Sequence, residues 1–242
     1  SRPRRVALCS YRDYVEEMTQ FIGYEAMRSL SLEPKSVRNE RSSCLVPLPF
    51  FTLGFRFVAQ EESPTCAFEG VRVSSKIALV PIIRGGLAMV RPMQSIVSKL
   101  VSALLLPSLI ILVLLYVLVP TTEVWHLGIY RDSQSLLPVE YFNKLPLEGK
   151  EYDTICILDP VCHTACTAIV AINIVKDWAA HVGAKVNIKF VTLVSARIGV
   201  DNIHAAHPDV EIWCAAVDSV LSAKGQVMPG VGDCGARLFK GN

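Results

Sequence analysis

The chain has 242 residues, of which 51% are hydrophobic and 19% charged, and its formal net charge is +2 at pH 7. This composition excludes an intrinsically disordered chain, and the small net charge excludes a global attraction for nucleic acid or for an anionic membrane. Any phosphate group must therefore be bound by local groups. The length suits one large α/β domain, and we interpret residues 1–242 as a single domain.

Eight cysteines are scattered through the chain without the paired spacing of a zinc ribbon or the density of a disulfide scaffold. They indicate a reducing, cytoplasmic setting. The first residues carry positive charge, but the apolar run that follows them is too short and too polar for a signal peptide. Because the chain does not begin with Met, we expect it to be a fragment.

Apolar residues recur at three- and four-residue steps between Arg12 and Leu32, which predicts an amphipathic helix. Its predicted inner face consists of Val15, Met18, Phe21, Ile22, Ala26 and Leu30. Residues 33–75 contain four prolines among apolar bursts and show no sustained period. We interpret them as an irregular arm or hairpin.

Five apolar runs predict buried strands. They lie at residues 76–83, 124–130, 152–158, 186–194 and 210–216, with helices predicted at roughly 164–181 and 200–207. Strands that alternate with helices are typical of an α/β fold with a parallel sheet, in which ligands bind outside the carboxyl ends of the strands.

Residues 100–120 carry no charge over 21 positions, a length at which a transmembrane helix must be considered. One membrane crossing here would separate Arg84-Gly85-Gly86 from residues 159–167, which are two halves of one predicted phosphate site. We therefore interpret residues 91–122 as a hydrophobic insertion that packs on the domain or on a partner subunit. A membrane-associated protein anchored by residues 100–120 is the weaker alternative.

Four motifs in chain order carry a family resemblance. They are ALVPIIRGGLAMV at 78–90, HLGIYRD at 126–132 with PVEYFNKLP at 138–146, ILDPVCHTACT at 157–167 and KGQVMPGVGDCGAR at 224–237. Together with GYEAMRSL in the first helix, they resemble uracil phosphoribosyltransferases of the type I family. The resemblance implies a parallel-sheet, Rossmann-like phosphoribosyltransferase fold with an N-terminal helix or arm and a flexible hairpin. It also implies transfer of phosphoribosyl from 5-phosphoribosyl 1-pyrophosphate to uracil, giving UMP and pyrophosphate.

The third motif suits a phosphate, because a loop between a strand and a helix presents backbone N–H groups and the positive end of the helix dipole. Thr164 and Thr167 add hydroxyl donors, and Asp159 is suited to accept hydrogen bonds from ribose hydroxyls, although it could simply cap the helix. Arg84 and Arg131 are suited to bind pyrophosphate through charge-assisted hydrogen bonds. The alternative is that each forms an ordinary surface salt bridge. The predicted phosphoribosyl pyrophosphate site comprises Arg84, Gly85, Gly86, Arg131, Asp159, Pro160, Val161, Cys162, His163, Thr164, Ala165, Cys166, Thr167 and Asp233.

The resemblance implies that the fourth motif binds uracil. Its predicted uracil-binding residues are Val227, Gly232, Asp233 and Cys234. Asp233 would favour loss of a proton from uracil or orient the ribose and a metal ion, and the predicted catalytic residues are Asp233, Arg84 and Arg131. The expected cofactor is Mg²⁺, shared with the substrate pyrophosphate rather than held by a metal site of the protein. The resemblance also gives GTP as a candidate effector and a homo-oligomer as the expected assembly.

The phosphate loop departs from the family pattern. Ala165 and Cys166 stand where the family has two glycines, and His163 stands where it has a small apolar residue. If a glycine is needed there for a positive φ or for close approach of the phosphate, a side chain costs about 1 kcal/mol or more and obstructs the ligand. The alternative to the enzyme is therefore a catalytically impaired binding or regulatory protein with the same fold.

Overall fold

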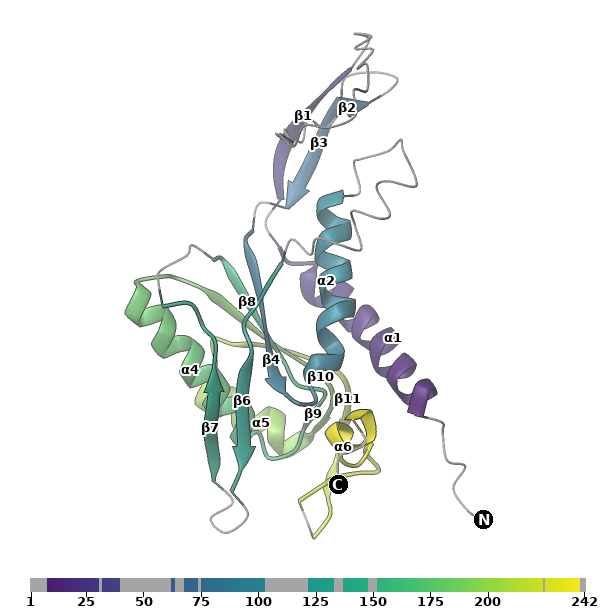
Figure 1. The fold of residues 1–242 in the computed structure, drawn as a ribbon, viewed down its shortest axis with the longest axis vertical. Coiled ribbons are helices and arrows are strands. Elements are labelled where there is room, and N and C mark those ends of the chain that lie inside the picture. Colours follow the sequence, from purple (N-terminus) through teal and green to yellow (C-terminus); the bar gives the residue numbers. More distant parts are fainter. Residues whose placement is uncertain are drawn as a thin grey trace, which may run out of the picture.

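The computed structural model describes residues 8–30, 32–39, 62–63, 68–73, 75–102, 122–132, 137–147, 152–223 and 225–239. Within these residues an eight-stranded sheet forms the centre of the protein, with helices on both faces (Figure 1). The order of the long strands is β11-β10-β8-β4-β6-β7, and the two-residue strands β5 and β9 pair with β4 and β10. The predicted α/β fold with a mainly parallel sheet is confirmed.

Six of these strands follow the five predicted apolar runs, whereas the strands at residues 138–143 and 161–162 lie outside them. Their bounds are β4 (Ile77–Ile83), β5 (Glu123–Val124), β6 (Leu127–Arg131), β7 (Pro138–Asn143), β8 (Thr154–Leu158), β9 (Val161–Cys162), β10 (Asn187–Ala196) and β11 (Glu211–Asp218). All pairs in this sheet are parallel except the pair of β6 and β7, which is antiparallel. The predicted strand at 124–130 is divided between β5 and β6.

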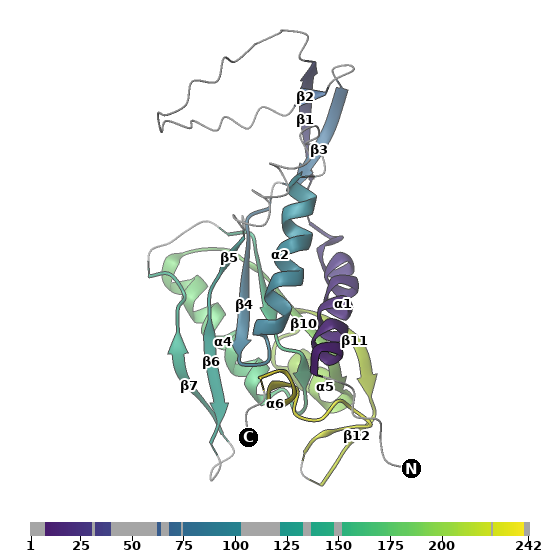
Figure 2. The same cartoon turned by 45° about the vertical axis from the view of Figure 1, so that its right-hand side comes forward.

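Five helices surround the sheet within the described residues. They are α1 (Leu8–Met27), α2 (Leu87–Ser102), α4 (Cys166–Val182), α5 (Arg197–Ala206) and the short C-terminal α6 (Cys234–Phe239). Figures 1 and 2 show α1 and α2 side by side on one face, with α4 and α5 on the other. The two-stranded pair of β12 (Val220–Leu221) and β13 (Val227–Met228) lies in the chain between β11 and α6.

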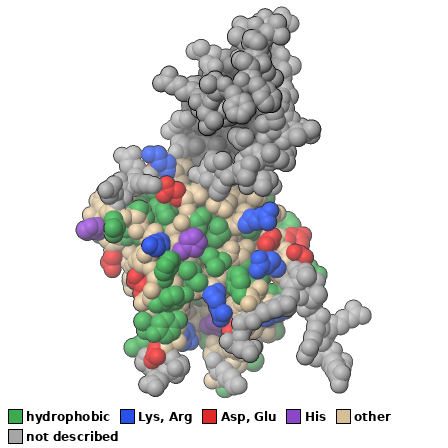
Figure 3. All heavy atoms as spheres, viewed as in Figure 1, with side chains coloured by type: hydrophobic (Ala, Val, Ile, Leu, Met, Phe, Trp, Pro, Cys, Tyr) green, Lys and Arg blue, Asp and Glu red, His purple; other side chains and the backbone are tan. Residues whose placement is uncertain are grey.

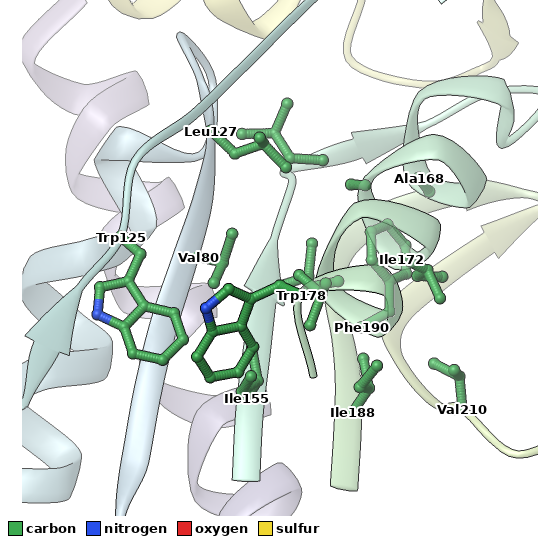
Figure 4. Close-up of a cluster of buried hydrophobic side chains, with 14 of the residues drawn as sticks. Val80, Trp125, Leu127, Ile155, Ala168, Ile172, Trp178, Ile188, Phe190 and Val210 are labelled. Atoms are coloured by element: carbon green, nitrogen blue, oxygen red, sulfur yellow. The ribbon is translucent and has the colours of Figure 1, made fainter. Parts of the chain in front are cut away.

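The strands have two buried faces because their apolar side chains alternate between two cores. In β4, Ile77 and Leu79 pack with α1 and α2, whereas Ala78 and Val80 pack with α4. Figure 4 shows the second core, in which Trp125 and Trp178 close one end. Near-continuous apolar strands are therefore explained by burial on both faces, as expected for a parallel sheet.

The inner face of α1 is narrower than predicted. Val15, Ile22 and Ala26 are buried, but Met18 and Phe21 are 43% and 63% exposed, so their predicted burial is wrong. Helix α1 approaches α2 closely at Gly23, where an added Cβ would lie 2.5 Å from Cδ1 of Ile96 in α2. Because the two helices are in such close contact, only a narrow set of α1 side chains is buried, and the side chains beside it remain exposed to solvent.

Two predicted boundaries change in the structure. The described parts of the 33–75 arm form a small sheet of β1 (Leu32–Asn39), β2 (Glu62–Ser63) and β3 (Phe68–Val73), in which β1 and β3 are antiparallel. The predicted start of the insertion, at residue 91, is wrong. Helix α2 continues to Ser102 and buries Met93 and Ile96 against the sheet and α1.

The uncharged run at 100–120 lies outside the described residues beyond Ser102. Among the helices that the structure describes, none is both long and apolar enough to cross a membrane.

One buried cation lies in the sheet. Lys189 in β10 is 1% exposed, and its Nζ donates to Ser29 Oγ at 2.7 Å and to Glu211 Oε2 at 2.5 Å. Its Nζ also lies 5.6 Å from the centroid of the Trp213 ring. Burial raises the pKa of Glu211, but hydrogen bonds from Asn187, Lys189 and Trp213 outweigh this and hold the pKa below its usual value.

We predict that removing the carboxylate of Glu211 costs more stability than replacing Lys189 with an apolar side chain. Glu211→Ala leaves the buried ammonium of Lys189 uncompensated and should lower the free energy of unfolding by about 2 kcal/mol, discounted because Glu211 is partly exposed. Lys189→Met should cost less than about 1 kcal/mol, because an apolar chain of similar length fills the same space. Urea unfolding at pH 7 measures both, and equal losses would contradict this account.

Candidate active site

A cavity of about 940 Å³ opens at the carboxyl ends of the parallel strands. Its walls come from the ends of β4 and β6, from the loop after β8, and from residues 225–226 and 233–235 near the C-terminus. Because β4, β6 and β8 run parallel, their carboxyl ends meet at one edge of the sheet. Segments that are far apart in the sequence therefore form one site.

Most of the predicted site residues line this cavity. They are Arg84, Gly85, Arg131, Asp159, Pro160, Val161, His163, Thr167, Asp233 and Cys234. All three predicted catalytic residues are among them. The two arginines and two aspartates give the cavity both cationic and anionic groups, which can bind a phosphorylated sugar at different points.

Seven predicted residues do not line the cavity: Gly86, Cys162, Thr164, Ala165, Cys166, Val227 and Gly232. Cys162 and Val227 are 3% and 4% exposed, so their side chains belong to the interior rather than to the cavity. Gly86 does not line the cavity, and an added Cβ there would lie 2.3 Å from the carbonyl oxygen of Leu158. Packing against β8 therefore requires a glycine at this position.

Asp159 lies at the end of β8, where its backbone N–H donates to the carbonyl of Val191 at 3.2 Å. Burial raises the pKa of its carboxyl group to about 7, against a smaller lowering by a hydrogen bond from the Val161 backbone. The carboxyl group is therefore poised to change its protonation state near neutral pH. Perturbed groups of this kind are concentrated at functional sites.

His163 and Arg131 meet on the phosphate-loop side of the cavity. Burial lowers the pKa of His163, the charge of Arg131 lowers it further, and Asp233 opposes both. The net lowering of the pKa favours the neutral imidazole. Arg131 Nη2 donates to Thr164 Oγ1 at 3.3 Å, which joins the end of β6 to the loop that precedes α4.

The backbone of this loop confirms the need for a positive φ. Ala165 has φ 69° and ψ 5° directly before α4, in the left-handed region that glycine occupies without strain. Its side chain is 4% exposed and packs in the core shared with α4, so the predicted obstruction by this methyl group is wrong. Cys166 is exposed, and its thiol lies 3.3 Å from Thr164 Oγ1.

Two tyrosines in the wall were missed by the sequence analysis. Tyr130 and Tyr141 line the cavity from β6 and β7, with ring centroids 5.9 Å apart. An added Cβ at Gly128 would lie 2.7 Å from Cζ of Tyr141, so this glycine leaves room for the ring. Figure 3 shows apolar side chains gathered over β6 and β7, and five apolar residues of this hairpin are exposed: Tyr130, Leu137, Val139, Tyr141 and Phe142. The sequence does offer a signal for them, because both tyrosines lie in the second motif, at 126–132 and 138–146.

Comparisons with known proteins identify the family. Residues 112–241 match the sequence model of the family described as uracil phosphoribosyltransferase. The uracil phosphoribosyltransferase of Roseiflexus sp. (strain RS-1) is 35% identical over 229 residues, covering 95% of this chain and 85% of that protein. The uracil phosphoribosyltransferase of Ureaplasma urealyticum is 32% identical over 242 residues, covering 99% of this chain and 92% of that protein.

A solved structure gives the same result for the fold. The structure of the AQ2163 protein from Aquifex aeolicus matches with a TM-score of 0.71 and 25% sequence identity, covering 98% of this chain and 89% of that one. Sequence and fold agree over nearly the whole length, and the predicted motifs converge on one cavity. The chain therefore belongs to the uracil phosphoribosyltransferase family.

Proposed function

We propose that the cavity at the carboxyl ends of the strands is where this enzyme transfers the phosphoribosyl group of 5-phosphoribosyl 1-pyrophosphate to uracil. One observation carries the proposal. Arg84, Arg131, Asp159 and Asp233 come from four separate motifs, and all of them line one cavity. The products of the reaction are UMP and pyrophosphate, which is a salvage route to a pyrimidine nucleotide.

The groups in the cavity suggest how the phosphorylated sugar is oriented. The backbone N–H groups at the start of α4 and the Thr167 hydroxyl would bind the 5′-phosphate, because a helix N-terminus favours an anion. Asp159 would accept hydrogen bonds from the ribose hydroxyls. Arg84 and Arg131 would bind the pyrophosphate, since guanidinium groups suit phosphate oxygens.

Uracil would bind against residues 231–234, with its N1 nitrogen directed at the anomeric carbon. The N1–carbon bond forms as the bond to the pyrophosphate oxygen breaks, and the N1 proton is lost. Asp233 is suited to favour that loss, and the two aspartates stabilise positive charge that develops on the sugar. The arginines stabilise the negative charge on the leaving pyrophosphate.

The cavity also suits Mg²⁺. The ion prefers oxygen ligands, keeps several waters and is commonly held by one or two carboxylates together with substrate phosphates. Asp159 and Asp233 supply carboxylates to the cavity, and no cluster of three metal-binding side chains occurs in the part of the chain that the structure describes. When bound together with the pyrophosphate, Mg²⁺ would neutralise its charge, and Asp233 is suited to orient the ion.

A second candidate function is a binding or regulatory protein with impaired catalysis. It is favoured by the strained backbone of Ala165 and by the exposed thiol of Cys166 beside Thr164. This contact involves the Thr164 hydroxyl, which would otherwise be free to bind phosphate.

A homo-oligomer is part of the proposal, and exposed apolar side chains support it. Tyr14, Met18 and Phe21 on α1 are 58%, 43% and 63% exposed, and Val217 on the edge strand β11 is 47% exposed. A second copy of the chain would remove this apolar surface from water. Activation by GTP stays a prediction.

The decisive experiment is an assay of UMP formation from uracil, phosphoribosyl pyrophosphate and Mg²⁺. We expect product formation with uracil and little or none with cytosine, because a site with fixed donors and acceptors rejects the wrong hydrogen-bond pattern. Binding of phosphoribosyl pyrophosphate without turnover of any base would instead favour the regulatory function.

We predict that the affinity for phosphoribosyl pyrophosphate falls as the pH drops below about 7, the pKa of Asp159. The ribose hydroxyls donate to the ionised carboxylate, and protonation removes that acceptor, so the Asp159 contribution should fall about tenfold per pH unit. Calorimetry between pH 5.5 and 8.5 measures it, and Asp159→Asn is the matched control. The phosphates of the ligand titrate equally with both proteins. If the affinity of the parent and that of the variant changed equally with pH, Asp159 would not bind the ribose.

The two departures in the phosphate loop should respond differently to glycine. Cys166→Gly removes the thiol from Thr164 and should lower the KM for phosphoribosyl pyrophosphate by about tenfold. Ala165→Gly relieves about 1 kcal/mol of backbone strain but loses a buried methyl group of similar worth, so stability and KM should change little. The uracil-to-cytosine rate ratio should stay constant in both. A larger effect from Ala165→Gly would show that its methyl group does face the ligand.

A further inference from the structure

The N-terminal turn of α1 contacts the C-terminal helix α6, although the two are about as far apart in the sequence as the chain allows. The ring of Tyr11 stacks under the guanidinium group of Arg237, with Cζ 3.7 Å from the ring centroid. Arg12 Nη2 donates to the carbonyl of Leu238 at 3.4 Å, and its guanidinium lies 5.5 Å from the centroid of the Phe239 ring. Figures 1 and 2 both place α6 beside the N-terminal end of α1.

Tyr11 also contacts Cys234, which lines the cavity. Tyr11 and Cys234 are 8% and 5% exposed and pack in one core, with the hydroxyl near the thiol. Burial, with smaller contributions from the Cys234 thiol, raises the pKa of Tyr11 above its usual value. The hydroxyl therefore stays protonated and available as a donor at physiological pH.

Arg237 and the start of α6 fix the loop that precedes them. Arg237 Nη1 donates to the carbonyl of Val231 at 2.8 Å. Asp233 caps the helix, because its Oδ1 accepts from the backbone N–H of Ala236 at 2.9 Å and its carbonyl accepts from the backbone N–H of Arg237 at 3.1 Å. The position of the Asp233 carboxylate is thus set by where α6 begins.

A helix as short as α6 cannot hold this position by itself. It has six residues, and isolated helices below about 12 residues are marginal in water, so its placement depends on tertiary contacts. Tyr11 provides two of them, one to Arg237 and one to Cys234. Loss of the tyrosine would release the helix start and, with it, Asp233.

We propose that Tyr11 is a positioning residue for uracil, which acts by holding Arg237 and Cys234 and thereby residues 231–234. The inference rests on the proposed function of that loop as the uracil site. It assigns to the N-terminal helix a role in the selection of the base that lies beyond packing. Phosphoribosyl pyrophosphate binds mainly to other segments, so the two substrates should respond differently when Tyr11 is changed.

Steady-state kinetics on the full chain test this. Tyr11→Leu removes the ring and the hydroxyl, and it should raise the KM for uracil by about tenfold while the KM for phosphoribosyl pyrophosphate stays within about twofold. Tyr11→Phe keeps the stacked ring and should raise the uracil KM only about threefold. The matched control is Tyr24→Leu, because Tyr24 is on the same helix and 48% exposed. It should leave both constants unchanged.

A substrate-free measurement separates this inference from the assignment of the uracil site. In Tyr11→Leu, hydrogen exchange at the backbone amides of Ala236 and Arg237 should accelerate, because these amides depend on the start of α6. Faster exchange with an unchanged uracil KM would mean that residues 231–234 do not bind uracil, which would overturn both proposals. Unchanged exchange, or an equal rise in the KM of both substrates, would overturn the role of Tyr11 alone.

Discussion

The parallel pairing of β4 with β8 is the constraint on which the rest of the molecule depends. Residues 77–81 pair with residues 154–158 in one register, so the two strands end at the same edge of the sheet. Arg84 and Asp159 follow these ends and line the same cavity. A change of register by one residue would reverse the faces of every side chain in the strand and separate the groups that the reaction needs.

Burial of both sheet faces explains why the site also requires the chain termini. The face of β4, β8 and β10 opposite to α4 is covered by α1 and α2, and α6 completes this core through Cys234 and Leu238. The first and the last helices are therefore neighbours, and Tyr11 lies between the hydrophobic core and a residue of the cavity. In this arrangement, the packing of α1 also affects where residues 231–234 lie.

The phosphate loop shows how a departure from a family pattern is accommodated. Ala165 keeps the left-handed backbone that a glycine would adopt, and its methyl group is directed into the core. The strain costs on the order of 1 kcal/mol, and burial of the methyl group offsets part of it. The other two departures lie differently, because Cys166 is exposed beside Thr164 and His163 lines the cavity.

The sequence by itself determined the five strands, the helix after Asp159 and most residues of the cavity, because buried parallel strands and a strand-to-helix phosphate loop have local patterns. The sequence did not predict features that depend on contacts between segments far apart in the chain. The exposure of Phe21 depends on how closely α1 meets α2 at Gly23, and the role of Gly86 depends on the carbonyl of Leu158. The contact of Tyr11 with Arg237 was likewise decided by the tertiary structure. Packing between segments that are remote in the sequence leaves no period or motif in either one.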